Sequence, residues 1–324
     1  MKALIAGLVF ALAAGGGAPA AAQGYPSRPI TMVVPFAAGG PVDTIARLLA
    51  VPMGRSLGQT VVVENVVGAA GTIGVGRVAR AAGDGYTLSI GHWSTHVVNG
   101  AVYPLDYDVL RDLEPLAMIA SNPLLVVAPP SLAPKDLKDL IVWLNANPDK
   151  ASAGTAGVGS ASHMGGVYFQ SMTGTKFQYI PYKGTGPALQ DLIAGRLDLI
   201  FDQASNSIPH VRGGRVKAYA VTAKTRLAAL PDVPTVDEAG LPGFYMAVWY
   251  GIWVPKNTPR ETVNKLNSAV VTALADPVVR QRLGDLGQEI PRREQQTPEV
   301  LGAYHRAEIE KWWPIIKAAG IKPE

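Results

Sequence analysis

The chain has 324 residues, of which 48% are hydrophobic and 17% are charged, so a large core can form and intrinsic disorder is disfavoured. The net charge of +4 is small and dispersed along the chain, which argues against a nucleic-acid partner. The absence of cysteine excludes disulfides, thiolate chemistry and cysteine-ligated zinc.

The first 22 residues have the pattern of a secretory signal peptide. Lys2 supplies the positive charge, residues 4–14 form a short apolar run, and residues 20–22 are the alanines of a cleavage site. The apolar run is too short to span a membrane, which needs about 18 or more uninterrupted apolar residues. We therefore predict an exported, soluble protein whose mature chain begins near Gln23.

Apolar strands alternate with helices in the first third of the mature chain. The expected elements are a strand at 30–35, a helix at 41–57, a strand at 60–64, a helix at 72–82 and a strand at 86–90. Pro41 suits the first turn of a helix, and Gly58 suits its end. Such alternation predicts a mostly parallel sheet with helices on both faces.

The middle of the chain repeats this alternation, and the end of the chain is helical. The expected strands lie at 124–128, 177–181, 197–201, 216–222 and 245–254, the helices at 134–147, 160–174, 188–194 and 208–211, and three last helices start near Pro259, Pro277 and Pro298. A loop rich in proline and glycine precedes the last strand.

This order of elements predicts an α/β protein with two lobes. The first lobe would comprise residues 23–121 and 231–324, and the second lobe would comprise residues 122–230. The chain would cross between the lobes near Ser121 and near Pro231. Two linked lobes commonly hold a ligand in the cleft between them and close over it by a hinge motion.

Residues 151–166 combine a glycine turn with the start of a helix. Ser160 and Ser162 are good N-cap residues, and a helix start presents free N–H groups to a carboxylate or phosphate. Similar small residues occupy loops at other expected strand ends; the four loops are residues 37–43, 68–74, 154–162 and 183–187. Ligands of open α/β sheets bind beyond such strand ends. We therefore predict an anion cleft built from backbone dipoles and hydroxyls, with Lys183 as the one full positive charge in these loops.

The segment G-H-W-S-T-H, which contains two histidines, follows an expected strand. His92 and His96 are four residues apart and could bind a metal together with Asp106 or Asp108. Alternatively, His92 and Trp93 line the wall of the cleft or simply pack. The sequence leaves both interpretations open.

Asp202 stands at the end of the expected strand 197–201. It is either a helix cap, with Asn206 nearby, or a polar contact to a ligand. The pattern supports the two interpretations equally.

Catalytic motifs are absent or weak. The chain contains no G-x-S-x-G, H-E-x-x-H or G-x-x-x-x-G-K-[ST] sequence. Residues 74–76 match a dinucleotide-binding pattern only partly, because they follow a loop and not a strand. Ser162 and His163 are neighbours in sequence and do not face each other on a helix, so they do not form a catalytic pair.

Seven stretches carry a resemblance to a known family. The first three are Y-P-S-R-P-I-T-M-V-V-P-F-A-A-G-G-P-V-D, V-V-V-E-N-V-V-G-A-A-G-T-I-G and G-D-G-Y-T-L. The other four are G-T-A-G-V-G-S-A-S-H-M, P-Y-K-G-T-G-P-A-L, D-L-I-F-D and L-P-D-V-P-T-V-D-E-A-G-L-P-G. In this order they resemble the Bug-type (TctC) periplasmic solute receptors of tripartite tricarboxylate transporters.

The resemblance implies a two-lobed fold of the type II periplasmic-binding-protein kind and water-assisted, backbone-based carboxylate binding between the lobes. The ligand contacts that it implies are Phe36, Ala37, Gly39, Gly40 and Asp43 in the first lobe, Gly159, Ser160, Ser162, His163, Thr185 and Gly186 in the second lobe, and Asp202, whose position is associated with selectivity. The chain departs from the family at Ala37-Ala38, where prolines are frequent, and at Pro41, which has neither an N–H nor a hydroxyl. His92 and Trp93, which we also place in the site, are bulkier than the residues often found there.

We therefore expect a non-catalytic periplasmic receptor that captures a dicarboxylate or an aromatic carboxylate and delivers it to the membrane subunits of a tripartite tricarboxylate transporter. We expect a monomer without a cofactor, a metal or a nucleic-acid partner. Two alternatives are an exported α/β enzyme that uses His92, His96 and an aspartate, and a receptor that presents its ligand to a sensor protein.

Overall fold

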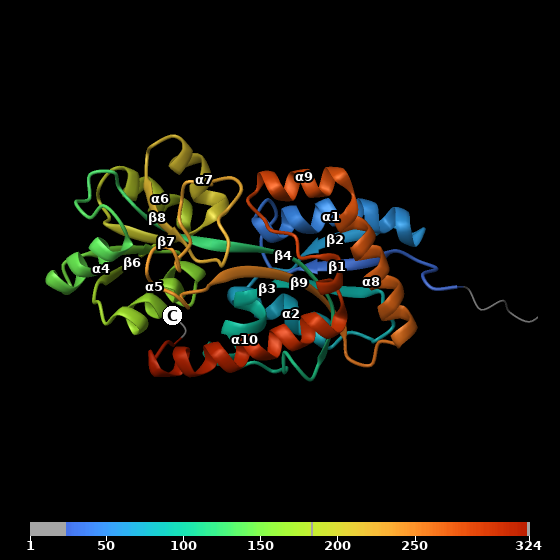
Figure 1. Cartoon of the computed structure of the whole chain (residues 1–324). Helices are drawn as coiled ribbons and strands as arrows, with labels where there is room; N and C mark the ends of the chain where they lie inside the picture. The colour runs from blue at the N-terminus through green and yellow to red at the C-terminus, as the bar shows by residue number, and fades with distance from the viewer. Residues whose placement is uncertain (1–23, 183, 323–324) are drawn as a thin grey trace, which may run out of the picture.

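The computed structural model describes residues 24–182 and 184–322 (Figure 1). The predicted signal peptide, residues 1–22, lies outside this range, and so does Lys183. Within the described range, no helix combines the length and the apolar character that a membrane crossing requires.

Strands and helices alternate along the described chain. The strands are β1 Ile30–Val34, β2 Val61–Asn65, β3 Thr87–His92, β4 Leu113–Ala128, β5 Ser152–Thr155, β6 Gln178–Pro181, β7 Leu199–Gln203, β8 Lys217–Val221 and β9 Ala247–Pro255. The α-helices are α1 Pro41–Leu57, α2 Thr72–Ala79, α3 Asn99–Val102, α4 Leu137–Ala146, α5 Ala161–Thr173, α6 Thr185–Ile193, α7 Ala204–Arg212, α8 Arg260–Ala275, α9 Pro277–Asp285 and α10 Pro298–Ala318. Short helical turns occupy Ala69–Gly71, Ser94–Val98 and Arg293–Gln295.

The strands form one mixed sheet in the order β2-β1-β3-β9-β4-β7-β5-β6, and β8 also pairs with β4. Strand β1 is parallel to β2 and β3, and β5 is parallel to β6 and β7. The central strands β4 and β9 run antiparallel to each other and to their outer neighbours. The prediction of a mostly parallel sheet is therefore correct for the outer strands and wrong for the centre, where the chain passes from one side of the molecule to the other.

The long strand β4 is the main departure from the expected elements. The sequence predicts a strand only over residues 124–128, whereas β4 begins at Leu113 and pairs with β9 as far as Pro123. Proline lacks a backbone N–H and is rare in central strands. Because of Pro115 and Pro123, the sequence of this segment does not look like that of a strand. The register of its pairing with β9 shifts after Pro115.

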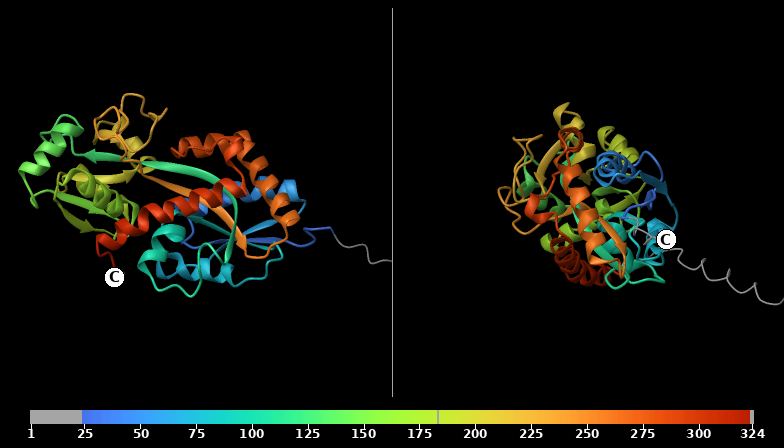
Figure 2. Two further views of the ribbon diagram at one scale, coloured as in Figure 1. Left: turned by 60° about the horizontal axis from the view of Figure 1, so that its bottom comes forward. Right: turned by 90° about the vertical axis from the view of Figure 1, so that its right-hand side faces the viewer.

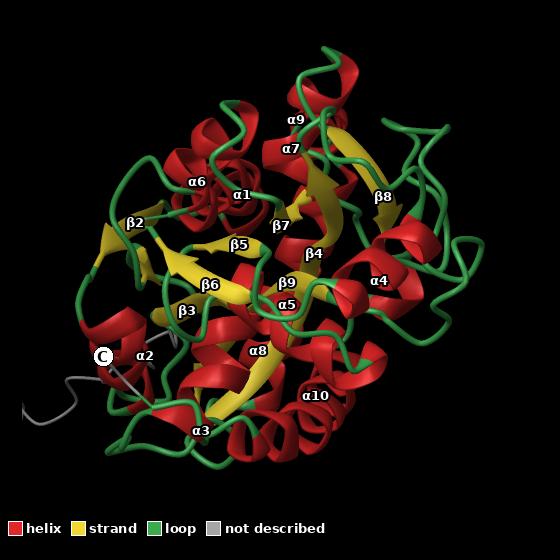
Figure 3. Cartoon of the chain, turned by 90° about the vertical axis from the view of Figure 1, so that its left-hand side faces the viewer, coloured by secondary structure: helices red, strands yellow, loops and turns green. Residues whose placement is uncertain are grey.

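Helices cover both faces of the sheet because neighbouring residues of a strand point to opposite faces. In β4, Leu124 and Val126 belong to the main hydrophobic core, whereas Leu125 and Val127 belong to a second core beneath α6 and α7. Figure 3 shows the strands inside the molecule with the helices around them. The expected two-sided arrangement of helices is thus confirmed.

The elements gather in two halves, which we call the first and second lobes. The first lobe holds β1, β2, β3, α1, α2, α8 and α9, and the second holds β5, β6, β7, β8 and α4 to α7 (Figure 1). Strands β4 and β9 run from one lobe into the other (Figure 2). Helix α10 also reaches both lobes, since the Trp312 ring contacts Trp93 in the first lobe and Tyr168 on α5. The boundaries at residues 121 and 231 stay a prediction.

Candidate functional site

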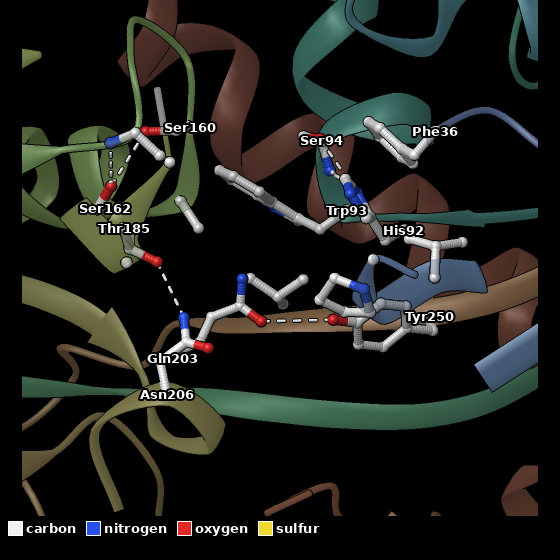
Figure 4. A pocket seen from close by; sticks show the side chains of 18 of the residues that line it. Phe36, His92, Trp93, Ser94, Ser160, Ser162, Thr185, Gln203, Asn206 and Tyr250 are labelled. Carbon is white, nitrogen blue, oxygen red and sulfur yellow. Dashed lines mark hydrogen bonds between the residues drawn. The ribbon is translucent and has the colours of Figure 1, made fainter. Parts of the chain in front are cut away.

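A cavity of about 730 Å³ lies between the two lobes (Figure 4). First-lobe residues Phe36, Ala37, Ala38, Gly40, Pro41, Val42, His92, Trp93 and Ser94 line one side. Second-lobe residues Ala156, Ser160, Ala161, Ser162, Gly184, Thr185, Gly186, Phe201, Gln203 and Asn206 line the other, and Val248 and Tyr250 of β9 complete the wall. None of these described lining residues is an aspartate, glutamate, lysine or arginine.

Four helices begin at this cavity. The N-cap residues of α1, α5, α6 and α7 are Gly40, Ser160, Gly184 and Gln203, and all four line the wall. The first N–H groups of a helix have no partner within the helix, and the helix dipole adds a partial positive charge there. The cavity therefore favours an anion although its described wall carries no full charge.

A buried carboxylate shapes the loop before α1. Asp43 accepts hydrogen bonds from the Gly39 N–H at 2.8 Å, the Arg47 Nε at 3.0 Å and the Asn65 amide at 2.9 Å. The same Asn65 amide holds the Phe36 carbonyl oxygen at 2.9 Å. The Arg47 hydrogen bond in particular lowers the pKa of Asp43 to about 2. Asp43 is thus ionised, and its carboxylate holds the loop by hydrogen bonds. The loop in turn places Phe36 at the cavity.

The start of α5 is held by its own serines. Ser160 caps the helix by accepting the His163 N–H at 3.3 Å, and the Ser162 hydroxyl accepts the Ala156 N–H at 2.9 Å. The two hydroxyl oxygens are 3.1 Å apart. The ring of His163 accepts the Gly159 N–H at 3.2 Å, which ties the glycine turn to the helix. The two serines face the cavity, while Gly159 and His163 support them from outside its lining.

Polar side chains from β7, β9 and the start of α7 form a second cluster. Tyr250 donates its hydroxyl to the Gln203 Oε1 at 3.3 Å, and Asn206 donates its amide to the Thr185 hydroxyl at 2.9 Å (Figure 4). Asn206 also donates to Asp202, at 3.3 Å. These contacts join second-lobe residues of β7, α6 and α7 to one another and to the crossing strand β9 at the cavity.

Asp202 lies directly behind this cluster and is fully buried. Its carboxylate accepts the Ser207 hydroxyl at 2.6 Å. Burial raises the pKa of Asp202 to about 6, and hydrogen bonds from Ser207, Asn206 and Thr185 oppose that rise. Asp202 therefore orients the residues that line the cavity and does not line it itself.

Aromatic rings form the first-lobe wall. His92 stacks on Phe36 with ring centroids 4.8 Å apart and meets the edge of Tyr250 at 5.9 Å. Burial lowers the pKa of His92 to about 4, so the ring is neutral near pH 7. Trp93 packs edge-to-face on Trp312 at 5.0 Å. This wall offers apolar and polarisable surface to the body of a ligand.

The described residues do not bring His92 and His96 together with an aspartate in one metal-binding cluster. His96 is fully buried and stacks on Trp253 at 3.6 Å, away from the cavity lining. Asp106 is paired with Arg80. No cluster of three or more histidine, aspartate or glutamate side chains with metal-binding geometry occurs within residues 24–182 and 184–322. His92 and His96 thus have separate structural roles.

The structure brings together most of the predicted site and places the rest behind it. The lining contains Phe36, Ala37, Gly40, His92, Trp93, Ser160, Ser162, Thr185 and Gly186. The lining does not contain Gly39, Asp43, Gly159, His163 and Asp202. The carboxylates of Asp43 and Asp202 accept protein hydrogen bonds that hold the loops, and direct ligand contacts by these two residues stay a prediction.

The loop 68–74 was also expected at the cleft, and that expectation is wrong. Gly74 instead allows close packing, since a Cβ there would lie 2.7 Å from the Val66 carbonyl oxygen and 2.9 Å from the Pro35 Cα. Helix α7 provides the fourth helix start in its place. The sequence did not lead us to include Gln203 and Tyr250 in the site. Gln203 could have been found, because ligands bind beyond the ends of strands and Gln203 ends β7. Tyr250 could not, because it lies within an apolar strand whose sequence shows no sign of a site.

The fold and the cavity define a two-lobed solute-binding protein. The family model for the tripartite tricarboxylate transporter family receptor, TctC, matches residues 45–321, and the chain belongs to this family. It is therefore a receptor of the substrate-binding kind and not an enzyme, and the resemblance seen in the sequence is confirmed.

Three similar proteins illustrate the family. BugT of Bordetella pertussis is 35% identical over 316 residues, which cover 97% of this chain and 96% of BugT. MatC of Rhodopseudomonas palustris, solved with bound malate, is 42% identical with a TM-score of 0.78, over 90% of this chain and all of MatC. Rpa4515 of R. palustris, solved with adipate, is 35% identical with a TM-score of 0.79, over 93% of this chain and all of that protein.

Proposed function

We propose that this receptor binds a small organic carboxylate in the cavity between its lobes and delivers it in the periplasm to the membrane subunits of a tripartite tricarboxylate transporter. The observation that supports this best is the meeting of four helix N-termini at a cavity without a charged residue in its described lining. Such a site neutralises a carboxylate by dipoles and hydrogen bonds.

The dimensions of the cavity agree with a small acid. Ligand pockets commonly enclose about 300–1,000 Å³, and this cavity encloses about 730 Å³. The similar proteins MatC and Rpa4515 were solved with malate and adipate, which are aliphatic dicarboxylates. The aromatic residues Phe36 and Trp93 also line this cavity, so an aromatic carboxylate is the second ligand class within the proposal.

The two lobes would close over the ligand by bending β4 and β9. Asn122 marks the crossing, since its buried side chain donates to the Gly287 carbonyl oxygen at 2.7 Å and accepts the Ser205 N–H at 3.3 Å. These bonds join a first-lobe segment to the start of α7. We propose that the lobes are residues 23–121 with 231–324 and residues 122–230, and that the receptor acts as a monomer.

A ligand screen tests the proposal. Native mass spectrometry of the purified receptor would identify a co-purified acid, and a thermal-shift panel of benzoate, phthalate, nicotinate, succinate, malate, citrate and glutamate would rank ligands. A ligand at a hundredfold excess over its dissociation constant stabilises the native state by about 2.7 kcal/mol, which is measurable. Binding of none of these acids, with a folded protein, would overturn the proposal.

A further inference from the structure

The last helix, α10, is anchored to the first lobe and runs on to the second (Figure 2). Near its middle, the His305 ring donates to the His96 carbonyl oxygen at 2.6 Å. Further along, the Trp313 indole N–H donates to the Val97 carbonyl oxygen at 2.9 Å. The residues of α10 that lie near these anchors therefore have a defined position relative to the first lobe.

The Glu308 carboxylate of this helix binds two indole rings through one oxygen. Its Oε2 accepts the Trp249 indole N–H at 3.1 Å and the Trp312 indole N–H at 3.2 Å. Trp249 belongs to β9, which passes from one lobe to the other. Burial raises the pKa of Glu308, and the indole donors and the positive charge of Lys311 oppose that rise. Glu308 thus holds the ring of Trp312 relative to the crossing strand.

The Trp312 ring contacts residues that belong to both sides of the cavity. Its centroid lies 5.0 Å from that of Trp93, which lines the first-lobe wall, and 5.3 Å from that of Tyr168 on α5. The N-cap of α5 is Ser160, which lines the opposite wall. Because Tyr168 and Ser160 share one continuous helix, a contact that holds Tyr168 also holds the start of α5.

Lys311 adds a charged contact between α10 and the second lobe. Its Nζ donates to the Tyr245 carbonyl oxygen at 2.9 Å and lies 4.7 Å from the centre of the Tyr168 ring. An ammonium group over an aromatic face is attracted by the ring electrons, and more strongly where water is excluded. The Tyr168 hydroxyl in turn donates to the Gly243 carbonyl oxygen at 3.0 Å. Lys311 therefore holds α5 and the segment before β9 together.

Residues 243–246, which lie just before β9, pack on the second lobe. The Phe244 ring lies 5.5 Å from the Phe169 ring of α5 and 6.1 Å from the Phe201 ring of β7. The hydrogen bond from Lys311 to this segment is thus a contact between the anchored helix and the second lobe.

We propose that Glu308, Lys311 and Trp312, which we call the α10 clasp, hold α5 and the second-lobe wall of the cavity in one position relative to the first lobe. All three lie outside the described lining of the cavity, so they are positioning residues and not ligand contacts. The inference concerns the arrangement of the lobes, and it does not depend on which ligand the cavity binds.

Distance measurements between the lobes test the clasp in the ligand-free receptor. The chain has no cysteine, so Val62→Cys on β2 and Val142→Cys on α4, at two exposed positions, provide unique sites for spin labels. In this background, Lys311→Met keeps the length of the side chain and removes the ammonium group. Pulsed electron paramagnetic resonance should then show the ratio of displaced to wild-type lobe arrangements rising about fivefold or more. Lys317→Met, at an exposed lysine of the same helix, is the matched control and should leave the distances unchanged.

Two substitutions of Glu308 test the shared oxygen. Glu308→Gln retains an oxygen that can accept both indole N–H groups, so it should keep the wild-type distances. Glu308→Leu removes the acceptor and leaves both indole N–H groups without a partner, so it should displace the lobes as Lys311→Met does. Glu310→Gln, at an exposed glutamate of α10, is the matched control.

Unchanged distances in a folded Lys311→Met receptor would overturn the clasp, and so would an equal change in the Lys317→Met control. A role in stability alone would lower the melting temperature and leave the distances well below it unchanged, and a circular-dichroism melt of each variant separates these two results. If Glu308→Leu does not fold, the Lys311→Met variant decides. Because no ligand is used, failure of this inference is distinct from failure of the proposed carboxylate binding.

Discussion

Replacing Ser160 and Ser162 by alanine tests the site at the start of α5. Ser160 is the N-cap, and loss of such a cap costs about 0.5–2 kcal/mol. Loss of the Ser162 hydroxyl leaves the Ala156 N–H without its partner, which costs about 1–3 kcal/mol when the group is buried. We expect the double variant to fold with a free energy of unfolding lower by about 1.5–5 kcal/mol.

We also expect the double variant to bind its carboxylate ligand more weakly, beyond any effect of its lower stability. If the two hydroxyls and the ordered N–H groups hold a carboxylate, their loss removes charge-assisted hydrogen bonds of roughly 1.5–3 kcal/mol, or about ten- to a hundredfold in affinity. Ser171→Ala, at an exposed serine of the same helix, is the control and should bind as wild type does. Titration calorimetry well below the melting temperature measures both effects. An unchanged affinity in the folded double variant would refute the assignment of these serines to the site.

Three further predictions concern export, the aromatic wall and pH. The exported protein should begin at Gln23 after cleavage behind Ala22, and an intact mass that retains Met1 in the periplasmic fraction would contradict export by cleavage. Trp93→Ala should cost about 3–5 kcal/mol of stability, because the ring is fully buried against Trp312; if aromatic acids stack on Trp93, calorimetry of this variant should show a weaker affinity for benzoate than in wild type, and an unchanged benzoate affinity would argue against stacking. Burial raises the pKa of Asp202 from 3.8 to about 6, so the folded state retains this proton longer than the unfolded state and wild-type stability falls as pH rises between these values. Relative to wild type, Asp202→Asn should gain up to about 3 kcal/mol between pH 4 and pH 7 in urea unfolding, and a difference that does not vary with pH would contradict the raised pKa.

Local sequence patterns predict the outer part of the fold well. Apolar runs bounded by glycine and proline mark β1, β3 and β7, and their loops reach the cavity as the strand-end rule expects. The first half of β4 could not be read in this way, because Pro115 and Pro123 interrupt a strand that exists only through its pairing with β9. Its stability comes from a partner more than a hundred residues away, which no local pattern records.

The candidate site likewise contains residues that local sequence patterns predict and residues whose roles they do not reveal. The loop residues Phe36, Ser160 and Thr185 follow from turn and capping chemistry, and all three line the cavity. The family resemblance implies ligand contacts at Asp43 and Asp202, whereas in the structure both carboxylates accept hydrogen bonds from the protein and neither residue is in the cavity lining. Whether a polar side chain faces a ligand or supports the residue that does so depends on three-dimensional neighbours.

The position of β9 has a consequence for the order in which the molecule can be assembled. This strand lies between β3 and β4 in the sheet, although it follows β4 by more than a hundred residues in the chain. Until residues 247–255 have been synthesised, β3 and β4 therefore each expose an unpaired strand edge, and strand edges of this kind invite association with other chains. Pairings between distant segments also form slowly. We expect fragments that end before β9 to aggregate, and we expect the complete chain to acquire its central sheet and its cavity together, as a late step of folding.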